Sequence, residues 1–225
     1  MERADTIELQ LGYMPTFDES KEQILAENLI FNGSNYKVFN DIQLFDEDKS
    51  FVIALDFTPG YVPTIGTTYS YLSCYEGASR AGLRITNGGI SDKGQLKQSA
   101  TSLQWTQNNP ISVNPSGHIS DGSMLYREIC VIRKVKGDDN LYFYRHNRYD
   151  TDLENGGVKV NTLLDAGGLT YQNFLNLNIP LTLGADYIPG TGASNIAKSG
   201  TIHYAKIWFD DLSDEVCKKI CSWTF

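Results

Sequence analysis

Hydrophobic and polar residues alternate along much of the chain, and this pattern predicts a protein built mainly from β-strands. The clearest example is the segment KSFVIALDFTP, in which Phe51, Ile53, Leu55 and Phe57 occupy every second position. Successive side chains of a strand point to opposite faces of the sheet, so these four residues would share the face that meets a core. We therefore predict a half-buried strand over this segment.

Turn residues divide the rest of the chain into further segments of the same kind. Residues 67–76 and 81–87 predict two neighbouring strands, and residues 124–135 and 141–147 predict a long hairpin. Other strands are expected at residues 29–39 and 179–186, near Leu96, and from Leu103 to Trp105. The spacing of these segments is typical of an antiparallel sheet protein.

The C-terminal region predicts one strand, residues 201–209, followed by a short amphipathic helix that begins after Ser213. Ser213 is a favourable N-cap because its hydroxyl can accept a hydrogen bond from an amide of the first turn. Acidic residues follow in the first turn and lysines in the last, which complements the helix dipole. The apolar positions fall on one stripe at helical spacing: Leu212, Val216, Cys217, Ile220 and Cys221.

The same C-terminal region resembles the concanavalin A-like lectin/glucanase superfamily in its laminin G-like variety. The resemblance is carried by LTLGAD, a loop, GTIHYAKIW and LSDE, and also by FNGSNY followed by SFVIALDF. It covers roughly Leu29 to Trp223 and implies an all-β fold, an antiparallel jelly-roll β-sandwich with one short C-terminal helix. We predict an N-terminal arm or edge segment over residues 1–28 and the sandwich domain over residues 29–225. Many domains that resemble it in this way belong to bacteriophage virion proteins.

Charge and hydropathy narrow the classes of partner. The formal net charge of −8 at pH 7 disfavours nucleic acid and acidic membrane surfaces as partners. No apolar run approaches the roughly 20 residues of a transmembrane helix, and MERADTIELQ is too acidic for a signal peptide. The four cysteines form no CxxC pair, so we expect them to be free thiols buried as small apolar residues.

One acidic run, Asp150-Thr-Asp152-Leu-Glu154, is the candidate for catalysis or metal binding. Some glycoside hydrolases of the superfamily carry two catalytic carboxylates in an E-x-D-x-E strand, but here the first position is Asp and Asn155-Gly-Gly follows, which is typical of a loop. We therefore expect no enzymatic activity. Oxygen-rich loops suit Ca²⁺, which makes Asp150, Asp152 and Asn155 candidate calcium ligands, with a charged surface turn as the alternative.

The predicted hairpin at residues 124–147 is rich in basic and aromatic residues. Alternation puts Tyr142 and Tyr144 on the face opposite Leu141 and Phe143. Arginines and aromatic rings on one face can bind a sugar by stacking and by charge-assisted hydrogen bonds, and a solvated outer face is the alternative. Six of the chain's 19 basic residues lie in or beside this hairpin: Arg127, Arg133, Lys134, Lys136, Arg145 and Arg148.

A second candidate for sugar stacking is the tryptophan in SLQWTQNNP, because it borders a polar loop; a core tryptophan is the alternative. We expect a ligand to meet the loops at residues 104–110, 145–157 and 186–199. The candidate glycan-binding residues are Trp105, Asn108, Tyr144, Arg145 and Arg148.

These observations favour a noncatalytic binding function. The prediction is a lectin-like carbohydrate- or receptor-binding module of a phage virion, in a tail, fibre or head-decoration protein. Its partners would be a cell-surface glycan or other virion subunits, in a homo-oligomer or a larger assembly. The alternative is a purely structural decoration or assembly protein of the virion, without glycan binding.

Overall fold

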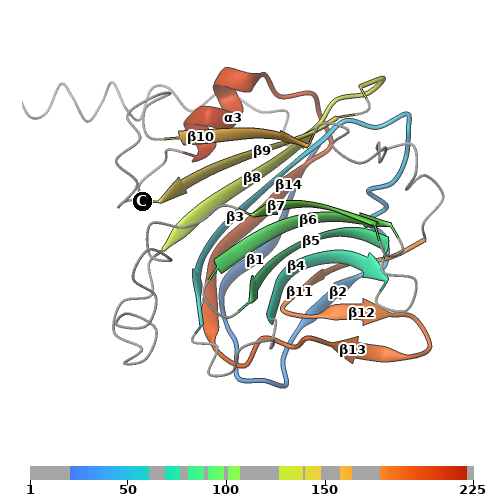
Figure 1. The fold of residues 1–225 in the computed structure, drawn as a ribbon, viewed down its shortest axis with the longest axis vertical. Coiled ribbons are helices and arrows are strands. Elements are labelled where there is room, and N and C mark those ends of the chain that lie inside the picture. Colours follow the sequence, from blue (N-terminus) through green and yellow to red (C-terminus); the bar gives the residue numbers. More distant parts are fainter. Residues whose placement is uncertain are drawn as a thin grey trace, which may run out of the picture.

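Two antiparallel six-stranded sheets pack face to face in the computed structural model, and one helix lies against the outside of the first sheet (Figure 1). The structure describes residues 21–60, 69–76, 81–88, 91–98, 101–106, 127–138, 140–147, 158–163 and 178–221. The observed fold is therefore the predicted antiparallel β-sandwich of the jelly-roll kind with a short C-terminal helix.

The first four described strands alternate between the two sheets, whereas the fourth to seventh all lie in one sheet and the eighth to tenth all lie in the other. The strands of each sheet pair in antiparallel fashion throughout the described residues. Sheet 1 has the order β1 (Glu22–Ile30), β14 (Gly200–Trp208), β3 (Phe51–Pro59), β8 (Glu128–Lys134), β9 (Leu141–Asn147) and β10 (Val158–Leu163). Sheet 2 has the order β2 (Lys37–Phe39), β11 (Leu181–Leu183), β4 (Tyr69–Glu76), β5 (Ala81–Gly88), β6 (Ser91–Gln98) and β7 (Thr101–Thr106). A separate hairpin joins β12 (Asp186–Ile188) to β13 (Gly192–Ser194).

The main core lies between the two sheets. Phe51, Ile53, Leu55 and Phe57 of β3 are all buried in it, as their alternation predicted. Tyr71 of β4 reaches across from sheet 2, and its ring centroid lies 5.1 Å from that of Phe57. Burial of such large apolar side chains, at roughly 1.5–3 kcal/mol each, is the main force that holds the two sheets together.

The other face of β3 is also buried, which corrects the prediction of a half-buried strand. Helix α3 (Asp214–Cys221) packs against this face of sheet 1 and covers Val52 and Ala54. The predicted apolar stripe of the helix supplies the contact, since Cys217 and Cys221 are fully buried. A helix docked from the far end of the chain therefore gives sheet 1 a second, smaller core.

The ends of α3 follow the predicted capping pattern. The amide of Val216 donates a hydrogen bond of 3.3 Å to the hydroxyl of Ser213. Lys218 also forms an ion pair of 2.7 Å with Asp214, one helical turn earlier. Capping and i,i+4 pairs together add on the order of 1–2 kcal/mol to a helix that is too short to persist alone.

Strand β1 was not predicted within these bounds, because residues 14–28, at the end of the predicted arm or edge segment, are typical of a turn with a short helical segment. It is an edge strand of sheet 1, paired with β14, and its register shifts between Ile24 and Ala26. This β-bulge places Leu25 and Ala26 both in the interior, so the period of two is lost. The predicted domain boundary at residues 28 and 29 falls inside this strand, and the arm predicted for residues 1–28 otherwise lies outside the described residues.

The remaining predictions of secondary structure agree well with the sheets. The strand pair β4–β5 and the hairpin β8–β9 are observed, while β6 and β7 are longer than expected and β10 was missed. All four cysteines are free and buried, as predicted. Within the described residues, no helix combines the length and the apolar character needed to cross a membrane.

Candidate functional site

A groove of about 480 Å³ opens where the segment between β2 and β3 meets the residue that follows β14. We call it the Phe209 groove. Its walls combine one aromatic ring with carboxylate, amide, ammonium and hydroxyl groups, which is a mixture that a ligand site needs and a packed core does not. The lining residues are Asp41, Gln43, Asp48, Lys49, Ser50 and Phe209.

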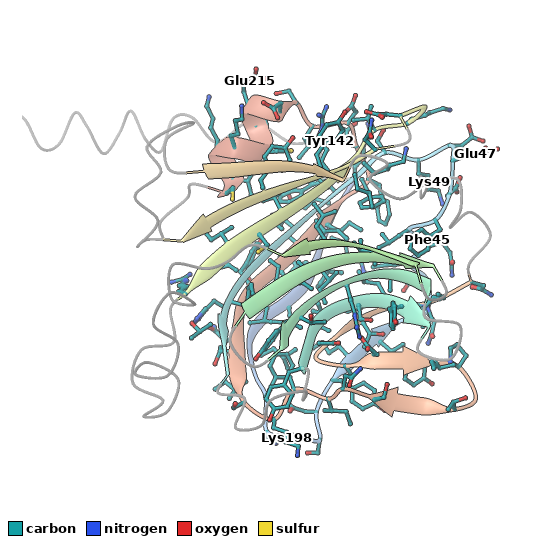
Figure 2. All side chains as sticks on the ribbon, viewed as in Figure 1. Phe45, Glu47, Lys49, Tyr142, Lys198 and Glu215 are labelled. Carbon is teal, nitrogen blue, oxygen red and sulfur yellow. The ribbon has the colours of Figure 1, made fainter. Side chains whose placement is uncertain are left out.

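The wall formed by residues 41–50 is held in place by apolar side chains that alternate with the lining residues. Ile42 and Leu44 are each only 1% exposed, and Phe45 is buried beside them. Between these anchors, Asp41 and Gln43 are left on the groove side. Figure 2 shows Glu47 and Lys49 at the margin of the molecule, with Phe45 nearer the sheets. A loop anchored in this way needs little ordering when a ligand binds.

Hydrogen bonds tie the same wall to neighbouring elements. The hydroxyl of Ser50 accepts a hydrogen bond of 2.8 Å from the amide of Lys136, in the turn after β8. The Lys136 ammonium lies 3.0 Å from the carboxylate of Asp48. On the other side, the amide of Phe209 donates to the carbonyl of Lys21 at 2.9 Å, and its ring packs against the main core. The groove therefore has walls fixed from three parts of the chain.

The turn at the tip of this wall orients Lys49. The Lys49 ammonium lies 3.0 Å from the Asp46 carboxylate, which also accepts the amide of Asp48 at 3.0 Å. These hydrogen bonds from Lys49 and from the Asp48 amide lower the pKa of Asp46 below its ordinary value. Asp46 consequently stays ionised at neutral pH and keeps Lys49 at the rim of the groove.

The polar groups of the groove differ in how many hydrogen bonds they already form within the protein. Gln43 donates its side-chain amide to Asn178 at 3.0 Å, which leaves its carbonyl oxygen as an acceptor. Asp41 is exposed and has no hydrogen bond or ion pair with any of the described residues. Both groups can accept hydrogen bonds from a donor in the groove, while the Phe209 ring offers a face or edge for apolar contact.

The predicted glycan-binding residues are only partly within the described structure. Trp105 lies in β7 opposite Gly94, in the cross-strand row that also holds Leu72 and Ile85. Arg145 lies in β9, and its side chain, like that of Trp105, is outside the described part. Asn108 and Arg148 fall outside the described residues, as do the candidate calcium ligands Asp150, Asp152 and Asn155.

Tyr144 is described, and its position corrects the prediction that it contacts a ligand. Its side chain is fully buried between sheet 1 and α3, and its hydroxyl donates to the carboxylate of Asp214 at 2.8 Å. Burial and the hydrogen bond to Asp214 raise the pKa of Tyr144. Tyr142 and Tyr144 thus serve the second core, because α3 covers the face that these two residues share.

The described part of the chain contains no arrangement of side chains suited to metal binding or to nucleophilic catalysis. No group of three or more His, Cys, Asp or Glu side chains lies there in a geometry suited to a metal ion. The ring nitrogen Nε2 of His203 lies 2.7 Å from the hydroxyl of Thr58, but no described carboxylate is hydrogen-bonded to His203. An orienting acid, as in a nucleophile–His–acid triad, is thus missing from these described contacts.

The Phe209 groove was not predicted, because the sequence Asp46-Glu47-Asp48 is typical of an ordinary turn. A signal was present in the alternation of Asp41 and Gln43 with the apolar Ile42 and Leu44. That alternation indicates a loop with one buried and one exposed side. It does not show that Phe209, far away in sequence, completes the opposite wall.

Comparison with known proteins identifies the fold. No family model matches the chain, and no curated protein matches its sequence. The CBM40 module of the Ruminococcus gnavus IT-sialidase is similar in structure, with a TM-score of 0.57 and 8% identity over 90% of this chain and 98% of the module. A further structure of that module contains α2,3-sialyllactose.

Two larger proteins contain similar domains. The leech intramolecular trans-sialidase, complexed with 2,7-anhydro-Neu5Ac, has a TM-score of 0.57 and 12% identity over 91% of this chain and 28% of that protein. The binding domain of Paraclostridial Mosquitocidal Protein 1 has a TM-score of 0.54 and 13% identity over 89% of this chain and 45% of that domain. At identities this low, the structural likeness shows a shared β-sandwich fold and leaves the ligand open.

Proposed function

We propose that this protein is a noncatalytic glycan-binding module and that the Phe209 groove is its binding site. The observation that carries the proposal is the groove itself, in which an aromatic ring lies beside carboxylate and amide acceptors on a rigid wall. Sugars combine apolar C–H faces with many hydroxyl donors, so they suit a ring flanked by acceptors. The similar CBM40 module, which was solved with a bound sialyllactose, supports the glycan as the class of ligand.

Each lining residue has a role in this proposal. The Phe209 ring contacts the apolar face of one sugar unit, while Asp41 and the Gln43 carbonyl accept hydrogen bonds from its hydroxyl groups. Lys49 and the Ser50 hydroxyl lie at the same groove and can donate to ring or glycosidic oxygens. The wall is built before the ligand arrives, which keeps the entropic cost of binding low.

The test is a glycan-array measurement on the purified protein, followed by titration calorimetry with the strongest ligand. Phe209→Leu keeps an apolar side chain but removes the ring, and we expect it to weaken binding about tenfold, in line with the worth of one aromatic contact. Glu215→Gln is the control, because Glu215 is exposed on α3 and lies outside the described groove lining and outside the loops predicted to meet a ligand (Figure 2). It should bind as the unmodified protein does.

The same titration distinguishes glycan binding in the Phe209 groove from glycan binding at Trp105, which the sequence predicted. If Trp105→Ala abolishes binding while Phe209→Leu has no effect, the glycan site includes Trp105 and the groove is not the site. If no glycan binds to the unmodified protein, the proposal of glycan binding fails as a whole. Circular dichroism on each variant excludes loss of fold as the cause.

A place on a phage virion, in a tail, fibre or head-decoration protein, remains a prediction from the sequence resemblance. The same holds for assembly into a homo-oligomer and for calcium bound by the Asp150 segment. Isolation of the protein with or without other virion subunits would test the first two, and binding in the presence of EDTA would test the third. The groove proposal depends on none of them.

A further inference from the structure

We infer that the Phe209 groove selects uncharged, hydroxyl-rich glycans and discriminates against sugars that carry a carboxylate. The inference rests on the proposed glycan-binding function and specifies its ligand class. It follows from two features of the groove: its excess of negative charge, and the presence of acceptor-only groups, Asp41 and the Gln43 carbonyl, among its described lining residues. Both features concern the side chains that line it and those that contact the lining.

The first feature is the charge on the wall. Four carboxylates lie within the eight residues from Asp41 to Asp48, the other two being Asp46 and Glu47. The two nearby ammonium groups are already engaged, since Lys49 pairs with Asp46 and Lys136 pairs with Asp48. Four carboxylates against two ammonium groups leave an excess of two negative charges.

The side of the groove near Phe209 does not cancel this excess. The next residue, Asp210, forms an ion pair of 3.4 Å with Lys21, so these two charges offset each other. No arginine is among the described residues that line the groove. Arginine is the side chain that binds a carboxylate through two parallel hydrogen bonds, so the groove lacks the usual partner of an acidic sugar.

The second feature is the balance between donors and acceptors. Lys49 and the Ser50 hydroxyl can donate, whereas Asp41 and the Gln43 carbonyl oxygen can only accept, since the Gln43 amide is engaged with Asn178. A sugar hydroxyl can donate to Asp41 and to the Gln43 carbonyl, whereas an ionised carboxylate can donate to neither. When the ligand carboxylate is buried against the oxygens of Asp41 and Gln43, neither side has a hydrogen-bond donor for the other, and this disfavours binding of the acidic ligand.

The size of the discrimination follows from the distance between charges. A ligand carboxylate about 6 Å from the exposed Asp41, in surroundings close to water in dielectric constant, is disfavoured about threefold by that charge. The other three carboxylates of the wall contribute a similar factor, so the total discrimination is about tenfold. Replacement of Asp41 by Asn removes the charge of the lining carboxylate that forms no ion pair with a described residue and keeps the shape of the side chain. We expect the discrimination to fall to about threefold, because Asp46, Glu47 and Asp48 remain.

The experiment uses an array of matched pairs, each a neutral oligosaccharide and its sialylated derivative, with lactose and α2,3-sialyllactose among them. The unmodified protein and Asp41→Asn are compared at low and at high salt. We expect the neutral member of each bound pair to bind about tenfold more tightly at low salt, with a smaller ratio at high salt because ions screen the repulsion. Asp41→Asn should bring the low-salt ratio down to about threefold.

Two outcomes would overturn the inference while glycan binding itself stands. In one, the sialylated member binds as well as or better than its neutral parent. In the other, the ratio is the same in Asp41→Asn as in the unmodified protein, which would show that the groove charge is not the cause. Absence of binding to every member of the array refutes the proposed function, and the inference falls with it. Equal thermal stability of the two proteins confirms that the variant is folded.

Discussion

Replacement of Asp186 is the sharpest test of how the β12–β13 hairpin is held against sheet 2. Asp186 is fully buried and accepts four hydrogen bonds from side chains. The hydroxyls of Ser70 and Ser73 donate to one oxygen at 2.6 and 2.7 Å. Arg84 and Asn195 donate to the other at 2.9 and 2.7 Å. One carboxylate thus joins the start of β12 to β4, to β5 and to the segment after β13.

The expected cost of Asp186→Ala comes from what the substitution leaves behind. Arg84, whose side chain is only 13% exposed, loses the carboxylate that balances its charge. The hydroxyls of Ser70 and Ser73 lose their acceptor in an interior site. Removal of one member of a buried ion pair costs about 3–5 kcal/mol, so we expect the free energy of unfolding to fall by about 4 kcal/mol. That is a large part of the roughly 5–15 kcal/mol that stabilises a domain.

Urea unfolding followed by tryptophan fluorescence measures this loss. The matched control is Asp48→Asn, because the ion pair of Asp48 with Lys136 is exposed and should contribute less than about 1 kcal/mol. A second variant measures the effect of the Arg84 charge in the absence of the Asp186 carboxylate. The double variant Asp186→Ala/Arg84→Met should recover about 1–2 kcal/mol of the free energy of unfolding lost in Asp186→Ala. If Asp186→Ala costs no more than the Asp48 control, the hydrogen-bonded cluster does not hold the hairpin and the reasoning is wrong.

Three further expectations concern α3, the histidine on β14 and the cysteines. Ser213→Ala removes the N-cap and should lower the free energy of unfolding by about 1 kcal/mol in the same urea assay; an unchanged value would show that the cap contributes nothing. Burial and the nearby Arg127 charge lower the pKa of His203 below 6.5, so its stabilising contribution is complete above that pH and is lost as the pH falls. Lowering the pH from about 7.5 to about 5.5 should therefore lower the melting temperature less in His203→Gln, which can still hydrogen-bond to Thr58, than in the unmodified protein. An equal decrease in both proteins would contradict this. Burial raises the pKa of Cys217 to about 12, and all four thiols are buried, so none should react with Ellman's reagent until the protein is unfolded in denaturant. Rapid labelling of the native protein would contradict that expectation.

Local patterns predicted much of the fold because they report on single elements. The alternation in β3, the cap at Ser213 and the acidic and basic ends of α3 were all readable, since each depends on neighbours within a few residues. The bulge in β1 was not readable, because it arises from pairing with β14 nearly two hundred residues away. Alternation correctly placed Tyr142 and Tyr144 on one face of β9, but it could not tell that α3 covers that face.

The candidate site shows the same division. The sequence by itself determined a mostly antiparallel sheet protein with one C-terminal helix, while the family resemblance implied the sandwich. Only the tertiary structure decided that Phe209 lines one groove with residues of the acidic loop 41–50 and that Tyr144 is buried against α3. The physical reason is that sheet order and helix docking are set by burial summed over the whole chain. They bring together residues whose local patterns carry no information about each other.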